Sequence, residues 1–275
     1  MSALSVTWVL ESQVFPATHA PLREAITRAG HAIVDWQDDW WAEGNWPGLA
    51  DSSVVFHGSL ENAARIRQTL PWQPGSFCDV AAFHCSSWYQ GAQKWLLHCQ
   101  WQALPAKELV DDSRRVLDAF GNPAAVFVRP DSPLKPFSGR VLASDKLSLE
   151  ALDYGFYYDD ASIPVVVAPV REVAREWRYV VVDRRVVAGS AYVASGRKAI
   201  PDEPNGAPWK MATQIAAQLD PPEAAYILDV CEADGEIRLL ELNPFSGADL
   251  YACRPDDVVA ALSELAVEMH RNASR

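Results

Sequence analysis

Two kinds of hydrophobic pattern alternate along the first hundred residues of this chain. Short apolar runs at residues 5–10, 32–35 and 53–57 predict buried strands, and residues 21–29 and 60–70 carry apolar positions at helical spacing. Strands that alternate with helices favour a small parallel α/β unit. The first part of the sequence therefore predicts an α/β domain.

After residue 105 the pattern changes to longer strands rich in Val, Ile and Leu. Nine of the eleven tryptophans lie in the first 101 residues. We therefore predict two domains, residues 1–104 and residues 105–275, in a mixed α/β (α+β) protein. In the second domain we predict helices at 106–120, 147–154, 209–219 and 255–271, strands at 125–129 and 164–170, a hairpin of 176–183 with 185–193, and a lid at 195–208.

The most informative segment is the predicted hairpin at residues 226–245, which turns at Asp234-Gly235. Side chains alternate across a strand, so one face is apolar and the other carries oxygen ligands. The apolar face holds Leu228, Val230, Leu240 and Leu242, and the polar face holds Asp229, Glu241 and Asn243. Such a set suits Mg²⁺, which uses one or two carboxylates plus substrate phosphates. A plain two-residue turn would pair Asp229 with Leu240, so the site requires a longer turn or a bulge.

Composition limits the classes of partner. The formal net charge is −12, which disfavours general binding of nucleic acid through its phosphates. No apolar run reaches the roughly 18 residues of a membrane span, and the N-terminus lacks the pattern of a signal peptide. Five irregularly spaced cysteines suit reduced thiols, so we expect a cytoplasmic protein. The oligomeric state stays open, a homodimer included.

Basic residues that could hold phosphates precede the hairpin. Arg129 and Lys135 lie in a loop with small residues, although the loop lacks the spacing of a P-loop. Glu176 and Arg178 begin a later strand on the same face, and arginine offers bidentate donors to phosphate or carboxylate.

These motifs resemble the ATP-grasp superfamily of carboxylate–amine and carboxylate–thiol ligases. The resemblance implies that Asp229 and the Glu-x-Asn of Glu241 and Asn243 bind Mg²⁺, and that strand 164–170 lies where backbone groups contact adenine. It also implies catalytic roles for Arg178 and Lys135 and nucleotide contacts from Lys135, Arg129, Glu176, Val167, Ala168, Val170 and Leu240.

The wording around Arg129, Glu176 and Glu241 is similar to a bacterial and phage clade of this superfamily named for two arginines and a lysine. The likeness covers about residues 105–275, and residues 1–104 would match the variable pre-ATP-grasp domain. A second nucleotide lysine in a glycine-rich loop is missing, and Ser138-Gly139-Arg140 is the candidate substitute.

The resemblance implies ATP and Mg²⁺ as cofactors and an ADP-forming carboxylate–amine ligase that acts through an acylphosphate. The carboxylate and amine would be small molecules or peptides. Kinase-type phosphoryl transfer and a non-catalytic nucleotide-binding regulator remain alternatives. Candidate contacts to an acidic substrate are Arg129, Tyr192, Lys198, Lys210 and Arg254.

Three other clusters have simpler interpretations. Cys78, His84, Cys85, His98 and Cys99 lack the spacing of a structural zinc site, so buried thiols are the better interpretation. The tryptophans at positions 36, 40, 41 and 46 are more typical of a core or domain interface than of a ligand platform. His57 and Glu61 form a commonplace pairing of a strand end with a helix start.

Overall fold

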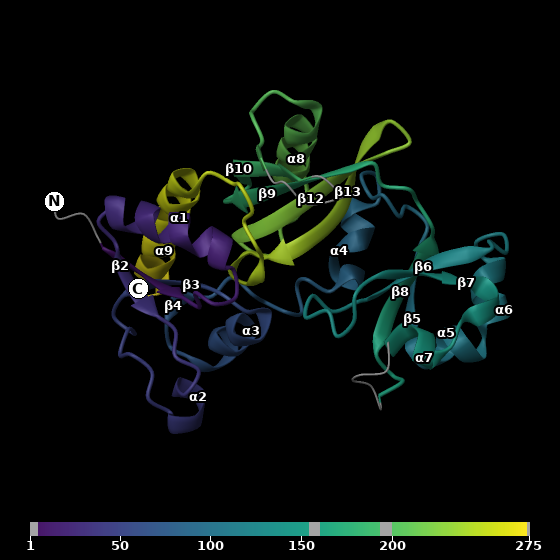
Figure 1. Cartoon of the computed structure of the whole chain (residues 1–275), viewed down its shortest axis with the longest axis horizontal. Coiled ribbons are helices and arrows are strands. Elements are labelled where there is room, and N and C mark those ends of the chain that lie inside the picture. Colours follow the sequence, from purple (N-terminus) through teal and green to yellow (C-terminus); the bar gives the residue numbers. More distant parts are fainter. Residues whose placement is uncertain (1–4, 154–159, 193–199, 274–275) are drawn as a thin grey trace.

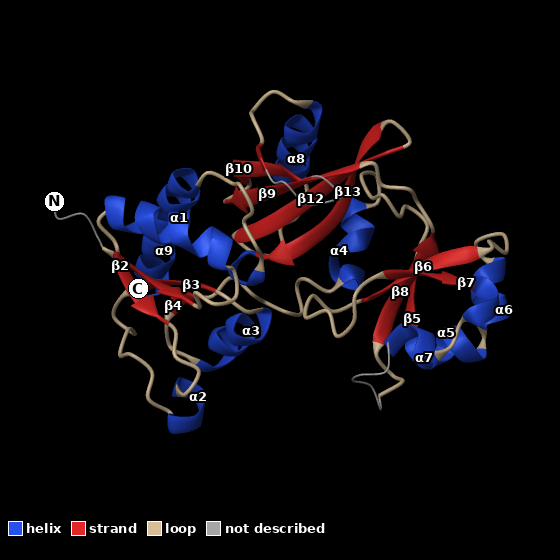
Figure 2. Cartoon of the chain, viewed as in Figure 1, coloured by secondary structure: helices blue, strands red, loops and turns tan. Residues whose placement is uncertain are grey.

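A computed structural model of the chain describes residues 5–153, 160–192 and 200–273. Within these residues, three β-sheets follow one another along the long axis of the molecule, each with helices packed on it (Figure 1). Figure 2 shows how helices and strands are interspersed over the whole length. The predicted mixed α/β class is confirmed.

The N-terminal sheet is parallel, with strand order β2-β1-β3-β4. Strands β1 and β3 are buried along their whole length, as expected of strands covered on both faces. The elements of this region are β1 (Val6–Leu10), α1 (Pro16–Arg28), β2 (Ala32–Asp35), α2 (Trp40–Glu43), β3 (Ser53–His57), α3 (Leu60–Thr69) and β4 (Gln73–Gly75).

The helix predicted at residues 21–29 begins earlier, at Pro16, and Pro21 lies inside it. Pro16 stands in the first turn, where a missing N–H costs nothing. An interior proline typically costs about 3 kcal/mol. Burial of Leu22, Ala25 and Ile26 against the core offsets that cost, so burial and not Pro21 sets the boundary.

The central sheet is antiparallel, with strand order β11-β10-β9-β12-β13. Both predicted hairpins are present, turning at residues 183–184 and 234–235. Of the predicted lid, residues 195–199 lie outside the described residues. The elements are α4 (Cys85–Ala92), β9 (Arg175–Val182), β10 (Arg185–Tyr192), β11 (Ile200–Pro201), α8 (Ala207–Gln218), β12 (Ala225–Ala233), β13 (Glu236–Pro244) and the 3-10 turn η2 (Phe245–Gly247).

The small sheet has strand order β5-β8-β6-β7 and is also antiparallel. The helix predicted at 106–120 is divided, because Asp112 has non-helical dihedral angles. Both parts still bury apolar side chains in one core, with Leu109 from the first and Val116 from the second. The elements are β5 (Gln102–Pro105), α5 (Ala106–Asp111), α6 (Ser113–Asp118), β6 (Ala125–Pro130), β7 (Arg140–Ala143), η1 (Ser144–Lys146), α7 (Leu149–Asp153) and β8 (Pro164–Pro169).

The C-terminal helix α9 (Pro255–Ala273) returns to the N-terminal sheet and lies beside α1 (Figure 1). Its Leu262 joins Trp8 in a core cluster that also contains Val180 of the central sheet. The Trp8 indole donates a hydrogen bond of 3.1 Å to Ser263. The division between residues 104 and 105 stays a prediction, and this core joins the N-terminal sheet to the central one.

Tryptophan packing follows the simpler interpretation. Trp36 is buried, and Trp40, Trp41 and Trp46 pack against the same cluster. The ring centroids of Trp36 and Trp40 lie 5.0 Å apart. These side chains therefore contribute to the core of the N-terminal region.

Candidate active site

The β12–β13 hairpin meets the register requirement through a bulge. Asp234 and Gly235 have positive φ and form a two-residue turn that pairs Ala233 with Glu236. The register then shifts between Asp229 and Val230, so that Asp229 pairs with Glu241. The extra residue is Leu240. The bulge therefore brings the two acidic side chains opposite each other.

The bulge also changes the apolar face. Leu239, and not Leu240 as predicted, joins Leu228, Val230 and Leu242 in the core cluster. The extra residue interrupts the alternation of side chains, so Leu239 and Leu242 share the core face while Leu240 packs in a separate cluster. Leu240 also lines a cleft beside Glu241.

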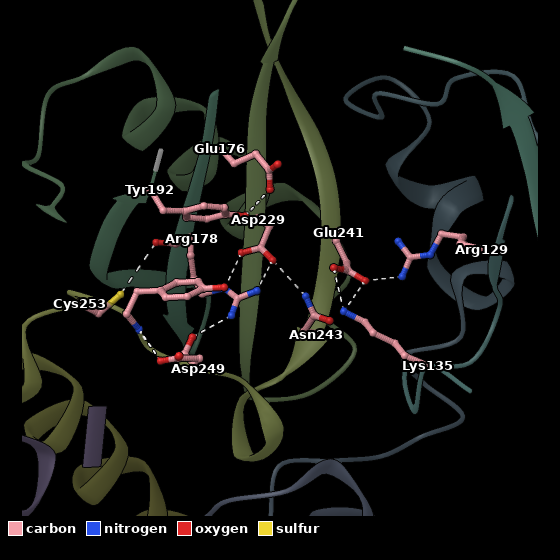
Figure 3. A network of polar contacts seen from close by, with 11 residues as sticks. Arg129, Lys135, Glu176, Arg178, Tyr192, Asp229, Glu241, Asn243, Asp249 and Cys253 are labelled. Carbon is pink, nitrogen blue, oxygen red and sulfur yellow. Dashed lines mark hydrogen bonds and ion pairs between the residues drawn. The ribbon is translucent and has the colours of Figure 1, made fainter. Parts of the chain in front are cut away.

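Asp229 and Arg178 form a buried ion pair at the centre of the sheet (Figure 3). The Arg178 Nε and Nη2 atoms donate to the two carboxylate oxygens at 2.9 and 2.7 Å. Asn243 donates to the same carboxylate at 3.1 Å. Burial alone would lower the pKa of Arg178, but the adjacent Asp229 raises it well above its usual range. Arg178 is therefore fixed in position and charged.

The Glu241 carboxylate forms ion pairs with two cations of the small-sheet region, Arg129 and Lys135 (Figure 3). Arg129 donates to one carboxylate oxygen, and the Lys135 Nζ lies 3.0 Å from the same oxygen. Burial would raise the pKa of the Glu241 carboxyl, but Arg129 and Lys135 hold it well below its usual range. The small sheet thus supplies the positive charge and the central sheet the negative charge.

The three predicted metal ligands form one oxygen-rich patch. Asp229 and Glu241 are cross-strand partners, and Asn243 contacts Asp229. Carboxylate and amide oxygens are the donors that Mg²⁺ takes, and a carboxylate has more lone pairs than the contacts described here use. The donor set therefore fits magnesium. Within the described residues there is no group of three or more His, Cys, Asp and Glu side chains that could hold a metal ion.

A cleft of about 250 Å³ lies between residues 129–139, the basic loop, and β13. Its lining combines ring, cationic and carboxylate groups from Phe127, Arg129, Lys135, Phe137, Gly139, Leu240 and Glu241. At Gly139 a Cβ atom would come within 2.8 Å of the Phe127 ring, so glycine lets the loop pass close to the cleft wall.

The other predicted nucleotide residues are not part of the described lining of this cleft and lie in different settings. Glu176 accepts a hydrogen bond from the Tyr192 hydroxyl. Val167 packs in the core of the small sheet, and Ala168 is buried beside Phe127 of β6. Val170 is exposed just beyond β8. The predicted role of Val167, Ala168 and Val170 uses their backbone groups, so the burial of a side chain does not conflict with it.

The candidates for an acidic substrate are not gathered together. Arg254 forms an exposed ion pair with Glu203, and Lys210 is exposed on α8. Lys198 lies outside the described residues. Arg129 and Tyr192 alone contact residues of the site.

Several residues of the site carry no sequence signal of their own. Asp249 accepts a hydrogen bond from Arg178 through its backbone oxygen at 2.8 Å. The Tyr251 ring lies 4.8 Å from the Arg178 guanidinium, and Tyr251 has a φ of 48°. Positive φ at a non-glycine residue is a strained conformation that gathers at functional sites. Only tertiary contacts bring this loop to Arg178.

His57 and Glu61 do not form the pair considered from the sequence. His57 is fully buried, with Nδ1 2.9 Å from His19 Nε2 and Nε2 3.0 Å from the Ala248 carbonyl oxygen. Glu61 is exposed in the first turn of α3. The histidine therefore faces the core while the carboxylate faces solvent.

Several solved structures are similar to this chain in fold. D-cycloserine synthetase DcsG has a TM-score of 0.64 at 14% identity, with 95% of this chain and 100% of that chain covered. D-alanine–D-alanine ligase from Bacillus anthracis, complexed with ATP, has a TM-score of 0.60 at 14% identity, with 98% of each chain covered. The ligase PsnB, complexed with a minimal precursor variant, Mg and ADP, has a TM-score of 0.59 at 15% identity, with coverages of 95% and 98%. No curated protein matches the chain in sequence.

The fold and the site together define an ATP-grasp protein. A family model described as an ATP-grasp domain, the second family of the clade named for two arginines and a lysine, matches residues 109–261, more than half of the chain. The chain belongs to this family. The predicted superfamily and clade are therefore confirmed, and they support the prediction of an ATP-dependent ligase. None of the described helices is long and apolar enough to cross a membrane.

Proposed function

We propose that the protein is an ATP-dependent, ADP-forming carboxylate–amine ligase that acts through an acylphosphate. One observation carries the proposal: Arg129 and Lys135 of the small sheet meet Glu241 directly beside the Asp229–Arg178 pair. Phosphoryl transfer requires mainly positioning and charge neutralisation. Arg129, Lys135 and Glu241 line the cleft, the buried Asp229–Arg178 pair lies beside them, and together these residues would provide both.

Each residue has a role that follows from its position. Asp229, Glu241 and Asn243 would hold magnesium, which when bound neutralises charge on the transferring phosphoryl group. Lys135 and Arg129 would bind phosphate oxygens, and Glu176, Leu240 and the backbone of residues 167–170 would complete the nucleotide site.

Arg178 would orient the acyl or phosphoryl oxygens. Its guanidinium has five N–H donors, and its contacts with Asp229 and Asp249 use three of them. The remaining two donors are available to a substrate oxygen. The pair with Asp229 prevents the guanidinium from turning as charge develops.

The chemistry proceeds in two displacements. A substrate carboxylate oxygen attacks the γ-phosphorus of ATP, the bond from phosphorus to the bridging oxygen breaks, and the electron pair leaves with ADP. The amine nitrogen then attacks the acyl carbon, the carbon–oxygen bond to phosphate breaks, and phosphate leaves. The nitrogen loses a proton as the amide forms. No side-chain nucleophile is required.

The proposal defines the substrates only by their chemical class. PsnB is complexed with a precursor peptide, and a Chryseobacterium gregarium ligase with a leader and core peptide. We therefore propose that peptide or amino-acid carboxylates and amines are the first pools to test. Five cysteines without a disulfide support a cytoplasmic location.

The test is product analysis with ATP, Mg²⁺ and pools of amino acids and peptides. A ligase releases ADP and yields a new amide in mass spectra, and hydroxylamine should trap the acylphosphate as a hydroxamate. Release of ADP with a stable phosphorylated product would instead identify a kinase. Nucleotide binding without ADP release would identify a regulator. Lys135→Ala should abolish turnover, whereas Lys146→Ala, an exposed lysine of the same small-sheet region, should not.

A further inference from the structure

A buried carboxylate lies at the start of the basic loop, outside the nucleotide chemistry described above. Asp131 follows Arg129 and Pro130, and only 4% of its surface is exposed. Leu134 and Lys135, a few residues further along, are exposed. A charged group is buried only where hydrogen bonds compensate its lost hydration. Its partners therefore indicate what it does.

Within the described residues, the hydrogen-bond partners of the Asp131 carboxylate belong to the start of α4. Oδ1 accepts from the Ser86 backbone N–H at 2.7 Å. Oδ2 accepts from the Ser86 hydroxyl at 2.7 Å and lies 3.1 Å from His84 Nδ1. The Asp131 backbone oxygen accepts from the Cys85 N–H at 3.0 Å. Helix α4 has no side-chain cap from its own N-cap residue, so Asp131 supplies the cap from a distant loop.

Helix α4 belongs to the core of the central sheet. Trp88, Tyr89 and Ala92 pack with Tyr179 and Leu228. The other side of Asp131 is tied to the small sheet, because its backbone N–H donates to the Pro164 carbonyl at 2.9 Å. Asp131 thus joins the two sheets that enclose the cleft.

The remaining ties of this loop are the functional contacts themselves. In the described part of the chain, the other hydrogen bonds and ion pairs from residues 129–139 to the central sheet are those of Arg129 and Lys135 with Glu241. Phosphates that bind Arg129 and Lys135 compete with those ion pairs. The contacts of Asp131 involve neither cation, so phosphate binding would not compete with them.

We propose that Asp131 is a positioning residue that holds Arg129 and Lys135 opposite Glu241. The inference rests on the proposed nucleotide role of this cleft. Without the Asp131 carboxylate, the loop would remain attached at β6 and β7 and would keep the backbone hydrogen bond from Cys85, but it would lose the side-chain contacts with Ser86 and His84 that help to fix its distance from β13. The expected effect is weaker nucleotide binding with an intact fold.

Asp131→Ala tests this through the affinity for Mg²⁺–ADP by calorimetry, the KM for ATP and the melting temperature. We expect at least a tenfold loss of affinity and a KM that rises more than kcat falls. Asp131→Asn should lose less, because its amide oxygen still accepts from the Ser86 N–H. Ser86→Ala, which removes one donor, should lie between wild type and Asp131→Ala.

Two controls separate positioning from helix capping. The Ser59 hydroxyl caps α3 by accepting a hydrogen bond of 3.3 Å from the Asn62 N–H. Ser59→Ala removes this cap and should lower the melting temperature without changing nucleotide affinity. Asp145→Ala, an exposed carboxylate of the same small-sheet region, should change neither.

Unchanged affinity in Asp131→Ala, with only a lower melting temperature, would overturn the inference. If that variant does not fold, unchanged affinity in both Asp131→Asn and Ser86→Ala overturns it. Failure of the wild-type protein to bind Mg²⁺–ADP would instead refute the proposed function, and the inference with it.

Discussion

Replacing Asp229 by asparagine should destabilise the protein strongly, because it leaves the Arg178 charge buried without its counter-ion. Arg178 and Asp229 are 8% and 1% exposed, and two hydrogen bonds of 2.9 and 2.7 Å join them. Breaking a buried pair by removing one partner costs about 3–5 kcal/mol. For a chain of this size, that corresponds to a fall in melting temperature of roughly 6–20 °C. Thermal unfolding followed by circular dichroism measures it.

Two comparisons make the result interpretable. The double variant Arg178→Met with Asp229→Leu removes both charges and should recover much of the lost stability, yet it should bind no Mg²⁺–ADP. Glu203→Gln breaks the exposed pair with Arg254 and should cost less than about 1 kcal/mol. A melting temperature of Asp229→Asn within about 2 °C of wild type would refute the argument that this ion pair is needed for stability.

Three further predictions concern the cleft and the buried histidine. Glu241→Ala should weaken Mg²⁺–ADP binding by at least about tenfold in calorimetry while the circular dichroism spectrum is unchanged; equal affinity would contradict the metal assignment. Gly139→Ala places a Cβ atom 2.8 Å from the Phe127 ring and should raise the KM for ATP at constant kcat, with an unaltered KM showing that the loop can shift freely. Burial, reinforced by His19, lowers the pKa of His57 to about 3. Unfolded His57 binds a proton below about pH 6.5 and the folded one does not, so stability should fall from pH 6.5 toward pH 3 by up to about 5 kcal/mol. The free energy of unfolding, measured by urea titration at several pH values, should fall less steeply with decreasing pH in His57→Gln than in wild type. An identical pH dependence in the two proteins would contradict this origin.

The late hairpin was predictable because its signals are local. The Asp234-Gly235 turn and the alternation around Asp229 and Glu241 fix the strands, and the parity of the two carboxylates alone required a bulge or longer turn. The sequence could not locate the bulge. Any residue between the two acidic positions and the turn could have been the extra one. Leu240 takes that place because Leu239 packs in the core.

The missed features depend on contacts between distant segments. Asp131 and Ser86 are 45 residues apart, and nothing in the loop's composition indicates a helix cap for α4. Tyr251 reaches Arg178 from the segment between η2 and α9, which is distant in sequence from β9. The contact of His57 with His19 was also missed because it joins distant segments, and His19 lies in a helix that begins earlier than predicted.

The charge arrangement has a consequence for how a nucleotide would enter. A metal ligand must be deprotonated, so binding at a protonated carboxyl would release a proton and depend on pH. Glu241 already has a pKa held well below its usual range by Arg129 and Lys135, and is therefore ionised near neutral pH. The same two cations would bind the phosphates that bring the metal. Binding then exchanges one set of ion pairs for another across the cleft, without uncovering an unpaired charge. Under the proposed function, the small sheet would both keep Glu241 ionised for magnesium and bind the phosphates, so the position of its loop would affect both.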